Sequence, residues 1–184
     1  MASPAVILAA GTSTRMGRPK ALLFLQQICA TLREGGADSL LVVVAAPHGE
    51  AVARMAAASG AQVVWNRHPE QGQVSSMALG LETLQGHPFA LLALVDHPDV
   101  SSTTVRTLLE AAVHEPSIVH LPVFHGERGH PVLLPTAAAP LLRASPSARE
   151  AIAQLEVREH PVDDPGILLD IDTAEGLSRW TETR

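Results

Sequence analysis

One stretch near the start of the chain decides the fold: residues 5–20 read AVILAAGTSTRMGRPK. Its first six residues are all apolar, as in a strand that is buried on both faces of a parallel sheet. The ten that follow hold two glycines, small hydroxyl residues and the cations Arg15, Arg18 and Lys20. Backbone N–H groups of such a loop can turn toward phosphate oxygens while the cations neutralise their charge. The stretch therefore predicts a buried strand that leads into a phosphate-binding loop.

This loop matches neither of two common phosphate-binding patterns. In a Walker A loop the lysine directly follows the second glycine and precedes Ser or Thr, whereas Gly17 and Lys20 are separated and Ala21 comes next. The dinucleotide fingerprint needs a G-x-G-x-x-G series, which Gly11 does not begin. Taken alone, the loop could equally be a solvated glycine-rich turn, so its function depends on what the fold brings beside it.

Outward from this stretch, apolar runs alternate with segments of helical spacing. Further buried strands are predicted at Leu40–Ala46, Gln62–Trp65, Ala90–Val95 and Ile118–Val123. Helices are predicted over Leu22–Glu34, Gly49–Ser59, Val74–Leu84 and Thr104–His114. After residue 131 the pattern loosens. A short strand is predicted at Val132–Leu134 and a helix at Ala148–Leu155. Late strands at Val157–Pro161 and Ile167–Asp172 and a final helix at Ala174–Thr181 follow.

The alternation predicts an α/β fold with a Rossmann-like, doubly wound, mostly parallel sheet. A length of 184 residues suits a single domain spanning 1–184. In such sheets ligands bind beyond the carboxyl ends of the strands. The segments that follow the predicted strands are therefore the ones in which a site is expected.

Composition narrows the range of partners. The net charge of −6 disfavours a groove for polymeric nucleic acid, which is normally basic. No apolar run approaches the ~20 residues that span a bilayer, and the first apolar run lacks the basic flank of a signal sequence. The single cysteine, Cys29, cannot form an intrachain disulfide. We expect a cytoplasmic protein without a membrane or nucleic-acid partner.

Three carboxylates follow predicted strands. Asp96 comes directly after the run that ends at Val95, and Asp170 and Asp172 stand at i and i+2, on one face of an extended chain. Carboxylate oxygens are the ligands that hard cations prefer, so three of them beside a phosphate-binding loop predict a magnesium–nucleotide site. Asp172 could instead be a helix N-cap, because Glu175 follows at the spacing of a capping box.

Residues 8–20 resemble the signature that opens the molybdenum-cofactor nucleotidyltransferases, a branch of the MobA-like NTP transferases. Further matches follow in order at residues 66–80, 96–98, 129–131 and 170–173, so the resemblance covers almost the whole chain. As a set they favour the cytidylyltransferase branch. The resemblance implies a fold of the nucleotide-diphospho-sugar transferase type.

The resemblance also implies roles for particular residues. The groups that bind the nucleotide, through main chain or side chain, would be Leu8, Ala9, Ala10, Gly11, Gly72, Ser75 and Ser76. Catalysis would fall to Arg15, Lys20 and Asp96, the first two of which hold the triphosphate and the leaving pyrophosphate. Mg²⁺ would be held by Asp96, Asp172 and Asp170, and the acceptor would face Gly129, His130 and Pro131.

The implied reaction transfers CMP from CTP to molybdopterin and releases pyrophosphate, with a cofactor-accepting enzyme as a further partner. CTP is expected over GTP because two alanines, Ala9 and Ala10, precede Gly11, where guanosine-using relatives carry a glycine in place of the second. An acceptor phosphate that is already ionised would need no general base; positioning and charge neutralisation would do the work.

Other functions stay open on the sequence alone. The same donor half would serve a cytidylyltransferase for a sugar, polyol or alcohol phosphate, and an idle nucleotide-binding chaperone is a different class. A nicotinamide dehydrogenase is the weakest alternative, because the loop lacks the required glycines. The segment Ala21–Ile28 is contracted relative to the family, and His97 stands where relatives often carry Gln. Either the loop after Lys20 is shortened or part of it is absent from the sequence.

Overall fold

The computed structural model describes residues 2–13, 16 and 18–182. The strands are β1 (Pro4–Leu8), β2 (Ser39–Val44), β3 (Gln62–Trp65), β4 (Phe89–Leu94), β5 (Val119–Phe124), β6 (Glu127–Arg128), β7 (Val132–Pro135) and β8 (Val157–Pro161). The helices are α1 (Ala21–Glu34), α2 (Gly49–Ala58), α3 (Gln73–Thr83), α4 (Ser102–His114), α5 (Ala139–Ala144), α6 (Ala148–Ile152) and α7 (Ala174–Glu182). Short 3₁₀ helices lie at Pro69–Gln71, Thr136–Ala138 and Pro165–Leu168.

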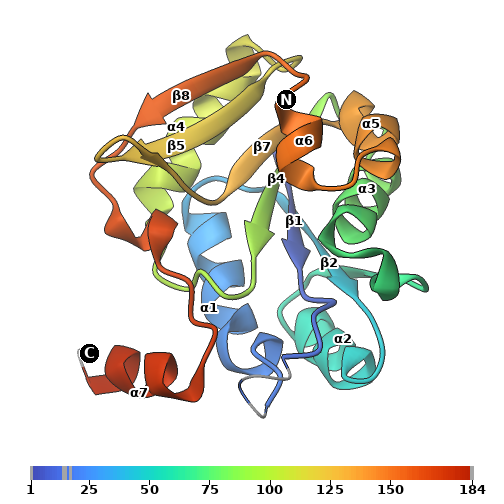
Figure 1. Cartoon of the computed structure of the whole chain (residues 1–184), viewed down its shortest axis with the longest axis vertical. Helices are drawn as coiled ribbons and strands as arrows, with labels where there is room; N and C mark the ends of the chain where they lie inside the picture. Colours follow the sequence, from blue (N-terminus) through green and yellow to red (C-terminus); the bar gives the residue numbers. More distant parts are fainter. Residues whose placement is uncertain (1, 14–15, 17, 183–184) are drawn as a thin grey trace.

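These strands form one sheet in the order β3-β2-β1-β4-β7-β5-β6, with β8 beside β5. The first four neighbours are parallel, as are β5 and β8. Strand β7 runs antiparallel between β4 and β5, and β6 is antiparallel to β5. Helices lie on both sides of the sheet (Figure 1). The predicted α/β, doubly wound, mostly parallel single-domain fold is confirmed.

Strand β1 is the centre of the core, and its side chains alternate between the two faces. Ala5 and Ile7 belong to the apolar cluster under α1, α2 and α4. Val6 and Leu8 belong to the cluster under α3, α5 and α6. Both clusters exclude water, which is why the strand is apolar at every position.

Helix α3 packs unusually close to β1. A Cβ on Gly80 would lie 2.6 Å from the Cγ1 atom of Val6, so only glycine allows this approach. Because of this close packing, the start of α3 lies beside the end of β1. The N-cap residue of α3 is Gly72, whose φ of +83° suits glycine. This packing brings the segment after β3 to the same edge as the loop after β1.

The register of the sheet sets two more loops side by side. Leu8 at the end of β1 pairs with Leu94 at the end of β4, so the chain leaves both strands at one edge. The strand β1 ends at Leu8, whereas the apolar run continues to Ala10. Ala9 and Ala10 lie beyond the strand and line a cavity, described below, although the Ala9 N–H still donates to the Val43 carbonyl of β2. Apolar sequence therefore overestimates this strand by two residues.

The chain after β8 forms a segment, residues 163–182, that we term the C-terminal arm. It crosses the edge of the sheet and ends in α7, which lies near α1 (Figure 1). The strand predicted at Ile167–Asp172 is wrong, because a 3₁₀ helix (Pro165–Leu168) is followed there by chain that pairs with no strand. In the described ranges no helix is both long and apolar enough to cross a membrane.

Candidate active site

The loop after β1 folds back on itself and places Lys20 at the first turn of α1. Ser13 takes a left-handed backbone with a φ of +51°, and its hydroxyl accepts a hydrogen bond from the Lys20 N–H at 3.0 Å. Lys20 is only 8% exposed. Arg15, the second cation expected to bind phosphate, lies outside the described residues.

Three carboxylates gather around the Lys20 ammonium; we term them the carboxylate cluster (Asp96, Asp170 and Asp172). One oxygen from each lies within 4.8 Å of the other two. The ammonium lies 2.9 Å from Asp96 and 3.8 Å from Asp170, and it also contacts Asp172. Between the last two, Ile171 is buried and donates its N–H to the Asp96 carbonyl at 3.0 Å. The expected i, i+2 geometry therefore holds without a strand.

The charges of this cluster do not balance. Burial alone would lower the pKa of Lys20, but its hydrogen bonds to Asp172 and Asp96 outweigh burial and raise that pKa. Burial, and then the charges of Asp96 and Asp172, raise the pKa of Asp170. Burial would also raise the pKa of Asp96, but hydrogen bonds from His97 and Lys20 lower it well below its usual range. Three carboxylates thus share one ammonium, a surplus of negative charge that favours a further cation.

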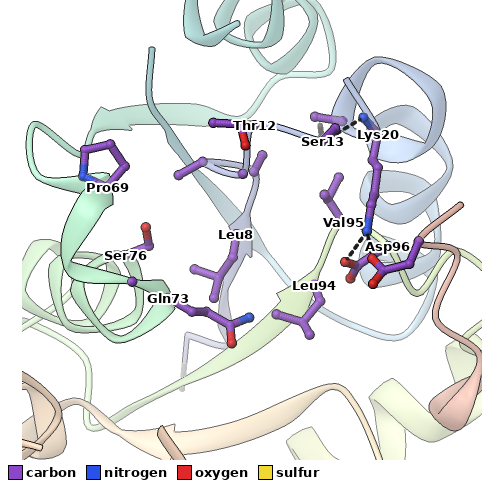
Figure 2. Close-up of a pocket in the computed structure, with 16 residues that line it drawn as sticks. Leu8, Thr12, Ser13, Lys20, Pro69, Gln73, Ser76, Leu94, Val95 and Asp96 are labelled. Carbon is purple, nitrogen blue, oxygen red and sulfur yellow. Dashed lines mark hydrogen bonds and ion pairs between the residues drawn. The ribbon is translucent and has the colours of Figure 1, made fainter. Parts of the chain in front are cut away.

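A cavity of about 350 Å³ opens beside the cluster. Figure 2 shows Lys20 and Asp96 on one wall and Pro69, Gln73 and Ser76 on the opposite one, with Leu8 between them. Its lining comprises Leu8, Ala9, Ala10, Gly11, Thr12, Ser13, Lys20, Ala21, Pro69, Gly72, Gln73, Ser76, Leu94, Val95, Asp96 and Asp172. We call this the smaller cavity.

The wall after β3 is held by a buried polar network around Asn66. Its Nδ2 donates to the hydroxyls of Ser75 and Ser76, at 2.8 and 2.9 Å, and its Oδ1 accepts from the His68 N–H at 2.8 Å. The Ser75 hydroxyl also lies 2.8 Å from the carbonyl of Gly72. Ser76 lines the smaller cavity, but Ser75 does not, so Ser75 shapes this wall from behind.

A larger cavity, of about 1030 Å³, adjoins the smaller one. The two share Leu8, Gln73 and Leu94, so they form adjoining compartments. Apolar side chains make up much of its surface: Met77, Leu92, Leu121, Val132 and Ile152. Gly129, His130, Arg128 and Arg149 also line it. Arg149 is exposed and has no ion-pair partner among the described residues.

His130 stands between the larger cavity and the carboxylate cluster. Its ring packs edge-on against His97, with centroids 5.0 Å apart, and the His97 Nδ1 lies 3.2 Å from an oxygen of Asp96. Burial, and then the neighbouring His97, lower the pKa of His130 to about 4, so it is neutral at neutral pH. Its Nδ1 is the one buried side-chain N or O atom without a partner in the described chain. Pro131 lines a crevice of about 20 Å³ with His97 instead of the larger cavity.

Most predicted site residues thus meet at one edge of the sheet. Sequence reasoning missed several residues that line the smaller cavity: Thr12, Ser13, Ala21, Pro69, Gln73, Leu94 and Val95. Gln73 had a usable signal, because it directly follows Gly72 in a segment already singled out. The N-cap alternative for Asp172 is wrong: the Thr173 hydroxyl accepts from the Gly176 N–H at 3.1 Å and caps α7.

Comparison with known proteins finds relatives over nearly the full length. Nicotine blue oxidoreductase of Paenarthrobacter nicotinovorans is 31% identical and aligns with 95% of this chain and 94% of its own. The crystal structure of Rv0371c from Mycobacterium tuberculosis is 26% identical, with a TM-score of 0.78 and 99% of each chain covered. A structure of Rv0371c in complex with manganese is 23% identical, with a TM-score of 0.76 and full coverage of both chains.

A nucleotidyl transferase from Methanothermobacter shares the fold at 21% identity, with a TM-score of 0.76 over 99% of this chain and 97% of that one. The sequence pattern of the MobA-like NTP transferase domain matches residues 5–162, which include the loop after β1, the wall after β3 and Asp96. The chain is therefore a nucleotidyltransferase that belongs to the MobA-like NTP transferase family.

Proposed function

We propose that the protein transfers CMP from CTP to a phosphorylated pterin, molybdopterin, and releases pyrophosphate. The observation that carries the proposal is the position of the Lys20–carboxylate cluster, on the wall of a smaller cavity that opens into a larger one. A transferase of this class needs a donor site and an acceptor site that meet at a charged junction. We assign CTP to the smaller cavity and the acceptor to the larger one.

The donor side relies on the main chain after β1. The N–H of Ala9 donates to the Val43 carbonyl at 2.9 Å and is therefore not available to a base. We assign recognition of cytosine to Ala10 and Gly11, whose main chains form no hydrogen bond with other described residues. The Ala10 methyl narrows this wall, which suits a one-ring pyrimidine. A buried polar edge left unpaired costs about 1–3 kcal/mol, enough for roughly tenfold discrimination between bases.

A divalent cation fits the carboxylate cluster. All three side chains offer hard oxygen ligands, and their surplus negative charge is only partly met by Lys20. Asp96, Asp170 and Asp172 are the residues that would hold Mg²⁺. When bound, the cation would neutralise phosphate charge at the transfer centre. The manganese in a structure of Rv0371c supports a divalent metal in this fold.

Lys20 is assigned to the triphosphate. Its ammonium is fixed on the wall of the smaller cavity by charged partners, and its raised pKa keeps it protonated at neutral pH. A fixed ammonium beside the phosphates stabilises the negative charge that develops on the leaving pyrophosphate. Arg15 is proposed as a second phosphate ligand from its place in the loop sequence.

The larger cavity is assigned to the acceptor. Its apolar lining suits the ring system of a pterin better than a polyol, and Arg149 offers an unpaired cation to an anionic group. Gly129 fits tightly there, because an added Cβ would lie 2.4 Å from the Ile167 carbonyl oxygen. Neutral His130 can donate or accept one hydrogen bond without adding charge.

The test is product formation. The protein is incubated with Mg²⁺, either CTP or GTP, and either molybdopterin or a sugar, polyol or alcohol phosphate. Pyrophosphate and adducts are measured by mass spectrometry, and nucleotide binding is measured by calorimetry. The expected product is the CMP adduct, formed at least tenfold faster than any GMP adduct. Equal or faster GMP transfer would remove the cytidine assignment and keep the family activity. Transfer of CMP only to a sugar, polyol or alcohol phosphate would replace the acceptor. Nucleotide binding without any transfer would identify a cofactor-delivering chaperone.

A second candidate rests on the relative that is 31% identical and named nicotine blue oxidoreductase. We therefore also consider an oxidoreductase activity of this chain. It is checked by mixing the protein with nicotine blue and NADH or NADPH and following absorbance. Our proposal expects no protein-dependent oxidation of either nucleotide.

The cytoplasmic location and a cofactor-accepting partner enzyme stay predictions.

A further inference from the structure

The C-terminal arm supplies two of the three cluster carboxylates, yet it lies beyond residue 162, where the match to the family pattern ends. Its last helix, α7, fully buries none of its described residues, and its packing on the core comes from two half-buried side chains, Leu177 and Trp180. A short helix that buries little apolar surface frays easily unless particular side chains tie it down. The arm therefore needs specific anchors if Asp170 and Asp172 are to stay in place.

Trp180 is such an anchor. Its indole N–H donates to the Asp99 carboxylate at 2.7 Å, and its ring packs edge-on against Phe24, with centroids 5.3 Å apart. Phe24 lies on α1, the helix whose N-cap residue is Lys20. Asp99 lies in the same loop as Asp96, and that loop is also tied to α1 by a hydrogen bond from the Gln27 side chain to the Pro98 carbonyl, 2.6 Å long. Trp180 therefore contacts α1, which follows Lys20, and the loop that carries Asp96.

Two anchors bracket the arm carboxylates. On one side of Asp172, Ile171 is inserted in the core and bonded to the Asp96 main chain. On the other side, Thr173 caps α7 and Trp180 fixes the helix to α1 and to Asp99. With both anchors in place, the arm carboxylates face Asp96 with little freedom to move apart.

We infer that Trp180 is a positioning residue for the cation site: by joining α7 to α1 and Asp99, it holds Asp170 and Asp172 opposite Asp96. The inference rests on the metal role proposed for the carboxylate cluster. Partners that orient metal ligands without touching the metal are typically worth 10–100-fold in metal affinity. Trp180 acts on the carboxylates through the helix and lines neither the smaller nor the larger cavity.

The experiment measures Mn²⁺ binding to the full-length, nucleotide-free protein by the EPR signal of free Mn²⁺. The variants are Trp180→Ala, which removes both contacts, and Trp180→Phe, which keeps a ring but loses the N–H donor. The matched control is Trp65→Phe, at the other tryptophan, on the edge strand β3 and outside both cavities. Circular dichroism and thermal melting verify that each variant is folded.

We expect Trp180→Ala to raise the Kd for Mn²⁺ by roughly tenfold or more, Trp180→Phe to raise it a few-fold, and the control to match the wild type. Should the alanine variant fail to fold, the phenylalanine variant carries the test. Equal Kd values for wild type and both Trp180 variants would overturn the positioning role and leave the metal site standing. Absence of saturable Mn²⁺ binding by the wild type would overturn both, so the two failures are distinguishable.

Discussion

Two aspartates of the C-terminal arm have opposite surroundings. Asp164 is buried, and both of its oxygens accept hydrogen bonds: from the Ser101 N–H at 2.9 Å, the Thr104 hydroxyl at 2.6 Å and the Gly166 N–H at 3.0 Å. Asp172 instead faces other carboxylates around the Lys20 ammonium. The same side chain is thus surrounded by neutral donors in one place and by like charge in the other.

The difference separates scaffold from site. A buried carboxylate whose oxygens are satisfied by donors stabilises the fold and has little capacity left for a ligand. Carboxylates that face one another store electrostatic repulsion, which a bound cation relieves. Asp164 joins the arm to the start of α4, whereas Asp170 and Asp172 leave the cluster short of positive charge.

The largest effect is expected at Lys20, the only lysine in the sequence. Lys20→Ala should lower kcat/KM for nucleotidyl transfer by about 10²–10³-fold, because it removes a fixed charge beside the phosphates. Lys20→Arg should restore little of it, since a planar guanidinium differs in shape from the ammonium held in this buried position. Pyrophosphate release measures both. Arg54→Ala, at an exposed cation of α2 that lines neither cavity, is the control. Undiminished release by Lys20→Ala would show that the lysine only balances charge.

Asp164→Asn should lower the free energy of unfolding by about 2 kcal/mol, because an amide N–H₂ group would face a donor where the carboxylate accepted. Urea denaturation measures the loss. The transfer rate per folded molecule should stay unchanged. Asp163→Asn, at the exposed neighbour, is the matched control. A lower transfer rate per folded molecule would assign Asp164 a role in the site in addition to its role in the scaffold.

Asp170→Asn and Asp172→Asn should act in the opposite way to Asp164→Asn. Each should weaken Mn²⁺ binding by roughly tenfold, about 1.4 kcal/mol, while changing metal-free stability little. For Asp170, whose pKa is raised by burial and by its acidic neighbours, metal-free stability should not fall at all. Calorimetry with Mn²⁺ and melting with and without metal check this. Equal metal affinity in both variants would exclude these residues as ligands.

The smallest effect is expected at His130, which contacts both the C-terminal arm and the surroundings of the carboxylate cluster. Its main-chain N–H donates to the Ile167 carbonyl on the arm, and its ring contacts His97 beside the cluster. Its pKa is about 4 in the folded protein, below an ordinary value of 6.5. As the pH falls, the His130 ring therefore takes up its proton in the unfolded chain before it does so in the folded protein. Its effect on the free energy of unfolding is absent above pH 6.5, and the protein loses stability as the pH drops toward 4.

His130→Asn should reduce this pH-dependent loss of stability by about 1 kcal/mol, after allowance for the partial exposure of the ring. Urea denaturation of both proteins at pH 4, 5, 6 and 7 isolates the contribution of His130 from those of the other histidines. An identical pH dependence in the two proteins would mean that the ring is solvated as freely in the folded state as in the unfolded one.

The sequence was most informative where local geometry decides structure. The strands β1 to β5, the helices between them and the extended spacing of Asp170 and Asp172 all follow from patterns within a few residues, and the structure confirms them. It was least informative after β8. There, Ile167 and Ile171 are both buried, but the first lies in a 3₁₀ helix and the second in chain without regular structure, so a short apolar run was mistaken for a strand.

By itself, the sequence determined the doubly wound sheet, the loop after β1 and the edge at which the candidate site residues gather, because these depend on apolar periodicity and on where strands end. Only the tertiary structure decided which aspartates are scaffold and which are site. Asp164 finds its donors 60 and 63 positions away, at Thr104 and Ser101, and Asp172 meets Lys20 across 152 positions. A carboxylate's role is set by the groups that face it, and those groups come together only when the chain folds.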